Sequence, residues 1–311
     1  MFAEPKAIVD THHHLWALDQ GRYPWLQYGY DPQAFILGDY RALCRDFGVP
    51  ELRQSFGGAP VVATVHVEAE RERAEALAET RWLHEQHARY GLPKFPSAVV
   101  AWIDLLAADA DERLAEQAAY PLVRGVRFKP VTGRKPDDRP TGAGSLHDKR
   151  WPEALERLAH HGLRWDLRVP FWHLEEAAAM LAKVPSVPVA VEHTGLPWDR
   201  SAAGLAVWRR GMQALAALPR VHVKLSEFGL RDQPWSTPDN ARIVAEAVAI
   251  FGWRRCMFGS NFPVASLRAY YTELIDMTQQ GLELAGLDEA RRQAVWCDNA
   301  LDFYAIAEVR P

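Results

Sequence analysis

Short apolar runs alternate along the chain with longer stretches of helical character. Runs of this kind, each followed by loop residues and an amphipathic stretch, are typical of βα units. The runs occupy Ala7–Val9, Val61–Val67, Ala98–Ile103, Val123–Phe128, Leu163–Val169, Val187–Val191, Val221–Leu225 and Arg255–Phe258. Because eight βα units close a parallel barrel, the pattern predicts a single-domain (β/α)8 TIM barrel over residues 1–311.

Between these runs, apolar residues recur at three- and four-residue spacing with charged residues in between. That spacing puts one apolar stripe on a helix, as the outer helices of a barrel require. The clearest stretches are Ala69–Tyr90, Arg150–His161, Ala203–Leu218 and Ala241–Phe251. An open, doubly wound sheet is the alternative, but no glycine-rich phosphate-binding turn follows the first run, which favours the barrel.

Two long segments interrupt this rhythm, and both follow predicted strands. Ala17–Pro60 is rich in aromatic residues and proline, and Thr132–Leu146 holds several glycines, prolines and charges. Loops after the strands of a barrel build its active site, so we expect these segments to form walls or lids of a pocket. The alternative is ordinary surface decoration.

The composition narrows the class of protein. The chain is 48% hydrophobic and 24% charged, which is the balance of a folded globular protein, and its formal net charge of −4 argues against binding to nucleic acid or membrane. Its three cysteines are too scattered for a disulfide framework, and we find neither a signal peptide nor a long apolar span. We therefore expect a cytoplasmic protein with a small-molecule partner, and leave a homo-oligomer open.

Three histidines lie at the ends of predicted strands. His12 and His14 follow the first run, and strand alternation puts their side chains on one face, where two imidazoles can share a metal ion. His193 ends the sixth run in the sequence VAVEHTGLP. Since the carboxyl ends of barrel strands meet at one mouth, we expect the three side chains to converge there.

Several motifs resemble one known family. They are DTHHHLW near the start, VRGVRF, EHTGLP, KLS, GSNFP and the late NALDFY. The chain resembles the metal-dependent amidohydrolase superfamily, of the amidohydrolase 2 type, in the branch of sugar-lactone and muconolactone-type lactonases. The resemblance implies that His12, His14 and His193 bind one or two divalent ions, Zn, Mn or Fe, or act directly on a lactone where no metal is present. A metal there would polarise a carbonyl oxygen and lower the pKa of bound water.

One departure from the family pattern concerns the acid after the eighth strand. Asn261 stands where the family usually has a metal-binding, proton-transferring Asp, and an amide cannot accept a proton as a carboxylate can. Glu68, which ends the second run beside His66, is the candidate replacement, as a metal ligand or a proton-transfer group. The alternative is that Glu68 only favours the dipole of the following helix. We predict Glu68, His193 and Asn261 as the catalytic set.

Further polar and aromatic residues are candidates for substrate binding. Arg127 can hold a carboxylate or carbonyl group bidentately, and the resemblance to the KLS motif places Lys224 in the pocket. Asp166 and Arg168 are two apart on the fifth run and share a face, either as an internal ion pair or in the pocket. Trp16, among the aromatics of the first long segment, favours an aromatic or hydrophobic substrate. Alternation points Glu192 away from the site.

These features predict a hydrolase of an ester-like bond, most simply a lactone. The alternatives on the same barrel are thioester or amide hydrolysis and nonoxidative decarboxylation. A catalytically silent binding protein is a further alternative because of Asn261. A serine nucleophile is excluded, since the chain has no GxSxG sequence.

Overall fold

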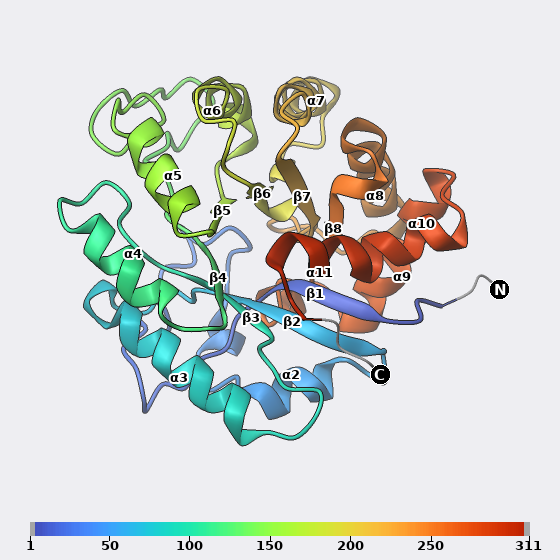
Figure 1. Cartoon of the computed structure of the whole chain (residues 1–311). Coiled ribbons are helices and arrows are strands. Elements are labelled where there is room, and N and C mark those ends of the chain that lie inside the picture. Colours follow the sequence, from blue (N-terminus) through green and yellow to red (C-terminus); the bar gives the residue numbers. More distant parts are fainter. Residues whose placement is uncertain (1–3, 308–311) are drawn as a thin grey trace.

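Eight parallel strands form the centre of the molecule, in a computed structural model that describes residues 4–307 (Figure 1). They pair in chain order, each with the next. The strands are β1 (Ile8–His13), β2 (Val61–Val67), β3 (Ala98–Ala101), β4 (Val123–Val126), β5 (Arg164–Leu167), β6 (Val189–Val191), β7 (Val221–Leu225) and β8 (Cys256–Phe258). All eight predicted strands and the predicted TIM barrel are therefore confirmed.

The barrel closes between β1 and the residues that follow β8. Asn261 N donates to the carbonyl oxygen of His12 at 2.6 Å, and His14 N donates to that of Phe262 at 2.8 Å. The buried Asp10 carboxylate joins the same seam, because it accepts from both Ser260 N at 2.8 Å and Ser260 Oγ at 2.6 Å. Closure thus fixes the backbone at the carboxyl ends of β1 and β8, where the predicted site residues lie.

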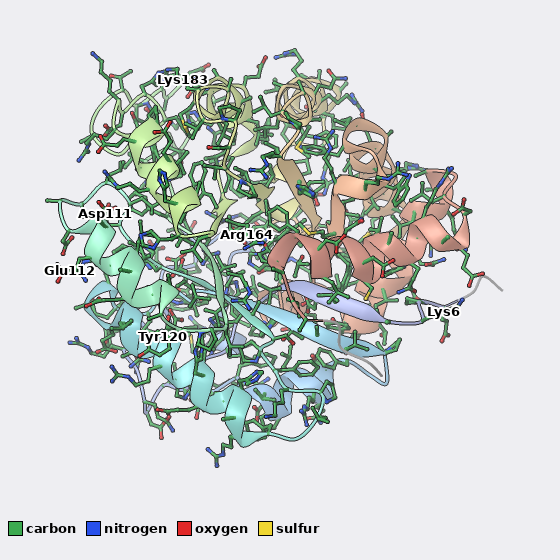
Figure 2. All side chains as sticks on the ribbon, in the orientation of Figure 1. Lys6, Asp111, Glu112, Tyr120, Arg164 and Lys183 are labelled. Carbon is green, nitrogen blue, oxygen red and sulfur yellow. The ribbon has the colours of Figure 1, made fainter. Side chains whose placement is uncertain are left out.

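Helices surround the strands (Figure 1), and Figure 2 shows charged side chains such as Asp111, Glu112 and Lys183 on their outer side. The α-helices are α1 (Pro24–Gln27), α2 (Val49–Ser55), α3 (Ala76–Arg89), α4 (Ala110–Ala118), α5 (Trp151–His160), α6 (Leu174–Leu181), α7 (Ala202–Ala216), α8 (Thr237–Phe251), α9 (Tyr271–Leu284), α10 (Glu289–Gln293) and α11 (Asn299–Tyr304). Short 3-10 turns occupy Arg41–Leu43, Arg73–Glu75, Phe171–His173, Glu192–Gly195, Trp253–Arg255 and Val264–Leu267, and Ala294–Asp298 is a π-helical segment. None of the described helices is long and apolar enough to cross a membrane.

The core has two parts, one inside the barrel and one between the strands and the helices. Inside, small and branched residues such as Val65, Val100 and Ala190 pack together at 0% exposure. Phe303 and Tyr304 of α11 belong to the same cluster and cover the amino ends of the strands, since Arg164 at the start of β5 donates from Nε to the carbonyl oxygen of Phe303. This end of the barrel interior is filled, and the cavity lined by His14 and His193 lies at the carboxyl end.

Candidate active site

Three side chains form a compact cluster at the carboxyl ends of β1 and β6. The ring centroids of His12 and His193 are 4.4 Å apart. Glu192 lies between them, with Oε1 3.7 Å from His12 Nδ1 and Oε2 3.8 Å from His193 Nε2. One ligand atom from each residue lies within 4.8 Å of the other two, which is the spacing of a set that could hold one metal ion.

Several polar atoms of this cluster have no hydrogen-bond partner within residues 4–307. They are His12 Nδ1, His12 Nε2 and Glu192 Oε1, all of them buried. Buried polar atoms in native proteins are nearly always paired, so orphaned ones require an explanation. Two imidazoles and a carboxylate suit a divalent first-row metal, and the donor set therefore fits the divalent ion that the sequence predicts.

The position of Glu192 corrects the sequence interpretation, which pointed this side chain away from the site. β6 is only three residues long, and Ala190 faces the barrel interior. Alternation from Ala190 therefore directs Glu192 inward. His193 reaches the same side because it adopts a left-handed backbone with φ 57°, followed by Thr194 at φ 54°, which turns the chain back over the mouth.

His14 lies beside this cluster, with its ring centroid 5.0 Å from that of His12. Its Nδ1 is 2.7 Å from the carbonyl oxygen of Val67. A carbonyl oxygen can only accept, so Nδ1 carries the proton and Nε2 keeps a free lone pair. Burial, reinforced by Arg127, lowers the pKa of His14 to about 3, and burial likewise holds the pKa values of His12 and His193 well below the ordinary 6.5. Burial therefore favours the neutral form of all three rings, which is the form that binds metal.

Glu68 belongs to an ion-pair network, and the carboxylate with an oxygen within 4.8 Å of ligand atoms of His12 and His193 is that of Glu192. Glu68 Oε1 accepts from Arg127 Nε at 2.8 Å, and Oε2 accepts from Arg73 Nη1 at 2.9 Å. Burial alone would raise the pKa of Glu68, but Arg127 and Arg73 outweigh it and bring the pKa down to about 2. Arg127 also reaches Glu192 Oε2 at 3.4 Å, so Glu68 is linked to the cluster through Arg127.

Asn261 is paired with an acid that the sequence analysis did not consider. Its Nδ2 donates to a carboxylate oxygen of Glu227, which follows β7, while its buried Oδ1 has no partner within residues 4–307. Both residues have a left-handed backbone, with φ 56° for Asn261 and φ 50° for Glu227, a conformation that often marks functional positions. Burial raises the pKa of Glu227 to about 7.

Asp166 and Lys224 meet inside the barrel, below the histidines. Lys224 Nζ donates to Asp166 Oδ2 at 2.5 Å and to the carbonyl oxygen of Thr11 at 2.7 Å. Tyr304 Oη donates to the same carboxylate at 3.0 Å. Both charged residues are fully buried, so they lie beneath the cavity and not in its wall. Arg168, in contrast, lines the cavity, so both members of the Asp166 and Arg168 pair point inward.

A cavity of about 310 Å³ opens above the cluster. His14, Arg127, His193 and Asn261 line it, which confirms that residues from distant strands meet at one mouth. The first long segment supplies an aromatic and aliphatic wall, as expected for a loop after a barrel strand. The residues of that wall are Trp25, Phe35, Ile36 and Tyr40.

Trp16 is not among the residues that line this cavity. It is 1% exposed, its Nε1 donates to the carbonyl oxygen of Arg45 at 2.6 Å, and its ring packs edge-on against Trp25 at 5.5 Å. Trp25 Nε1 is in turn fixed by the carbonyl oxygen of Ala69 at 2.9 Å. Trp16 therefore supports the wall from behind. Trp25, and not Trp16 as the sequence suggested, lines the cavity.

The comparisons with known proteins agree with this fold and site. A family model described as Amidohydrolase matches residues 9–306. The chain is 30% identical to the uncharacterized protein y4mH of Sinorhizobium fredii, over 96% of this chain and 99% of the relative. It is 28% identical to the L-fucono-1,5-lactonase of Burkholderia ambifaria, over 96% and 95%. A crystal structure of an amidohydrolase from Burkholderia multivorans with bound zinc has a TM-score of 0.78 and 27% identity, covering 96% of this chain and 99% of that one. The chain therefore belongs to the amidohydrolase family and is a hydrolase of the amidohydrolase superfamily.

Proposed function

We propose that this protein hydrolyses a lactone, an internal ester, in the cavity above His12, Glu192 and His193. The observation that carries the proposal is the set of buried atoms on His12 and Glu192 that have no hydrogen-bond partner within residues 4–307. They lie next to His193, which lines a cavity with polar and aromatic walls. The similarity to an L-fucono-1,5-lactonase over nearly the whole chain supports the lactone.

His12, Glu192 and His193 would hold one divalent ion, with Zn, Mn and Fe all suited to these donors. When bound, such an ion supplies a Lewis acid that polarises the lactone carbonyl and acidifies water. Arg127 holds the Glu192 carboxylate in place from one side, and Glu68 holds Arg127. On this account Glu68 acts through Arg127 and does not touch the substrate.

The remaining steps belong to the residues of the cavity wall. Asn261 Oδ1 accepts a hydrogen bond from the attacking water, and Glu227 orients it by accepting from Nδ2. His14 Nε2 passes the proton of that water on to the ring oxygen without holding it, because Nδ1 is already committed to the Val67 carbonyl oxygen and the low pKa of His14 disfavours a lasting imidazolium. The water oxygen bonds to the carbonyl carbon, the ring C–O bond breaks, and the ring oxygen leaves as a hydroxyl group with the proton that His14 passes on. The carboxylic acid that forms releases the other water proton to solvent. Asp166, Lys224 and Trp16 support the site from behind.

The test is a lactonase assay on protein of known metal content. Purified protein is analysed for Zn, Mn and Fe and then given L-fucono-1,5-lactone and other sugar-acid lactones, with acid release followed by a pH indicator. We expect about one equivalent of metal and catalysed ring opening, both lost in His12→Ala. His147→Ala, at an exposed histidine outside the cavity, is the control and should keep both. Metal-replete protein that opens no lactone would overturn the proposal.

The role of His14 can be separated from that of a ligand with one further variant. If His14 moves the proton, His14→Ala keeps its metal and loses turnover. If His14 is instead a metal ligand, as the resemblance to the family implies, His14→Ala loses its metal, as His12→Ala does. Elemental analysis of the two variants side by side decides between these roles.

A further inference from the structure

A second, larger cavity adjoins the one above the cluster. It has a volume of about 610 Å³ and shares Ala34, Ile36 and Arg168 with the first cavity. The second long segment contributes to it through residues 132–134, so both long segments build walls. Neither His12, Glu192 nor His193 lines this outer cavity, so it offers binding space without the reactive cluster.

Arg168 lies where the two cavities meet, just after β5. The other cations that line the inner cavity are neutralised, because Arg127 pairs with Glu68 and Lys129 pairs with Glu70. The guanidinium group of Arg168 makes no hydrogen bond or ion pair with any residue between 4 and 307, although the side chain is half-buried. Burial lowers the pKa of Arg168 from its usual value although the carboxylates of Glu70, Glu192 and Glu227 act in the opposite direction without contacting it, so a bound anion would further relieve this poorly solvated charge.

The outer cavity has an aromatic wall beyond Arg168. Trp172 and Trp198 have ring centroids 5.9 Å apart, with their planes inclined by 60°. Trp172 Nε1 is fixed by the carbonyl oxygen of Gly133 at 3.3 Å. Two inclined indole rings present apolar faces that suit a flat or aliphatic group.

We propose that the substrate carries an anionic oxygen group, such as a carboxylate, that binds Arg168, and an apolar extension that lies against Trp172 and Trp198. This rests on the proposed function, because the lactone occupies the inner cavity while the anion and the extension continue outward. Arg168 can bind such a group with two parallel N–H donors. A charge-assisted contact of this kind is worth about 10- to 100-fold in affinity.

The test measures binding without turnover, so that it does not depend on hydrolysis. The probes are 3-phenylpropane-1-sulfonate and its uncharged methyl sulfone, chosen because a sulfonate binds divalent ions weakly. Calorimetry on the metal-containing protein should show the sulfonate binding about 10- to 100-fold more tightly than the sulfone. Arg168→Gln should abolish this difference, whereas Arg242→Gln, at an exposed arginine on α8 outside both cavities, should keep it.

A second variant tests the apolar extension. Trp172→Ala should weaken the phenyl-bearing sulfonate but leave propane-1-sulfonate unchanged. An equal affinity for sulfonate and sulfone in the unaltered protein, or a preference that survives Arg168→Gln, would overturn the proposal. Failure of the proposed function would look different, because the binding pattern would remain while no lactone is opened.

Discussion

Two buried polar clusters lie one above the other in the same barrel, and they differ in how well their atoms are paired. In the lower cluster, the Asp166 carboxylate receives hydrogen bonds from Lys224 and Tyr304. In the upper cluster, His12 and Glu192 keep buried atoms without partners among the described residues. A satisfied buried network stabilises a fold, whereas an unsatisfied one costs free energy unless a ligand completes it. We therefore propose a structural role for the lower cluster and a chemical role for the upper one.

The largest expected effect comes from breaking the lower cluster. Lys224→Met removes the counter-charge of Asp166 and leaves a carboxylate buried with only Tyr304, which should cost about 3–5 kcal/mol in the free energy of unfolding. Urea unfolding at pH 7 measures this loss. Lys224→Met combined with Asp166→Leu should recover much of it, and a single variant as stable as the parent would contradict the structural assignment.

Breaking the upper cluster should cost little stability and much activity. His12→Ala removes ring atoms that have no hydrogen-bond partner in the described part of the chain, so in metal-free protein it should cost less stability than Lys224→Met. Its kcat/KM for a lactone should fall by about 100-fold or more, because a ligand of the catalytic ion is lost. Unfolding of metal-free samples and lactone kinetics test the two halves of this prediction. A larger stability loss for His12→Ala than for Lys224→Met would reverse the comparison.

Glu227 provides a pH test at the edge of the upper cluster. Its pKa is about 7 in the folded protein and about 4.3 when unfolded, so the folded state binds this proton more tightly. The resulting stability is present below about pH 4 and is lost as the pH rises through 7. Relative to the parent, Glu227→Gln should therefore gain about 2–3 kcal/mol between pH 5 and pH 8. A difference in unfolding free energy that is the same at both pH values would refute the burial of this acid.

The smallest expected effects concern the wall of the cavity. Trp16→Phe loses the hydrogen bond to the Arg45 carbonyl oxygen, which should cost about 1 kcal/mol of stability and leave KM unchanged. Trp25→Phe alters a side chain at the cavity and should raise KM by about 2- to 10-fold. Steady-state kinetics of the two variants distinguish the residue behind the wall from the residue in it.

The sequence predicts the barrel because eight apolar runs reflect strands buried on both sides. It predicts that His12, His14 and His193 converge because strand ends meet at one mouth, whereas Asn261 was singled out only through the resemblance to the family. It could not place Glu192, since a three-residue strand does not fix the phase of alternation and the left-handed turn at His193 leaves no periodic signal. Glu227 was missed for a related reason: a single Glu after the KLS motif has no spacing that links it to Asn261.

The aromatic content of the first long segment predicted a wall but not which tryptophan faces the cavity. The sequence indicates an aromatic wall in the segment 17–60, and the structure has one, but composition does not tell which Trp faces the cavity. That choice depends on an antiparallel bridge between Trp16 and Phe47, which draws Trp16 inward and leaves Trp25 at the surface of the cavity. Asp166 and Lys224 illustrate the same limit, because strand alternation gives the face of a side chain but not its depth in the barrel.

The most direct test of the central claim is anomalous X-ray diffraction from crystals of the zinc-loaded protein. The account predicts one strong peak bounded by His12, Glu192 and His193, with ligand distances of about 2.0–2.2 Å, and no peak at this position in His12→Ala. A zinc peak at another position would contradict it. So would crystals in which Asp166 and Lys224 are well ordered but no zinc peak appears beside His12, Glu192 and His193.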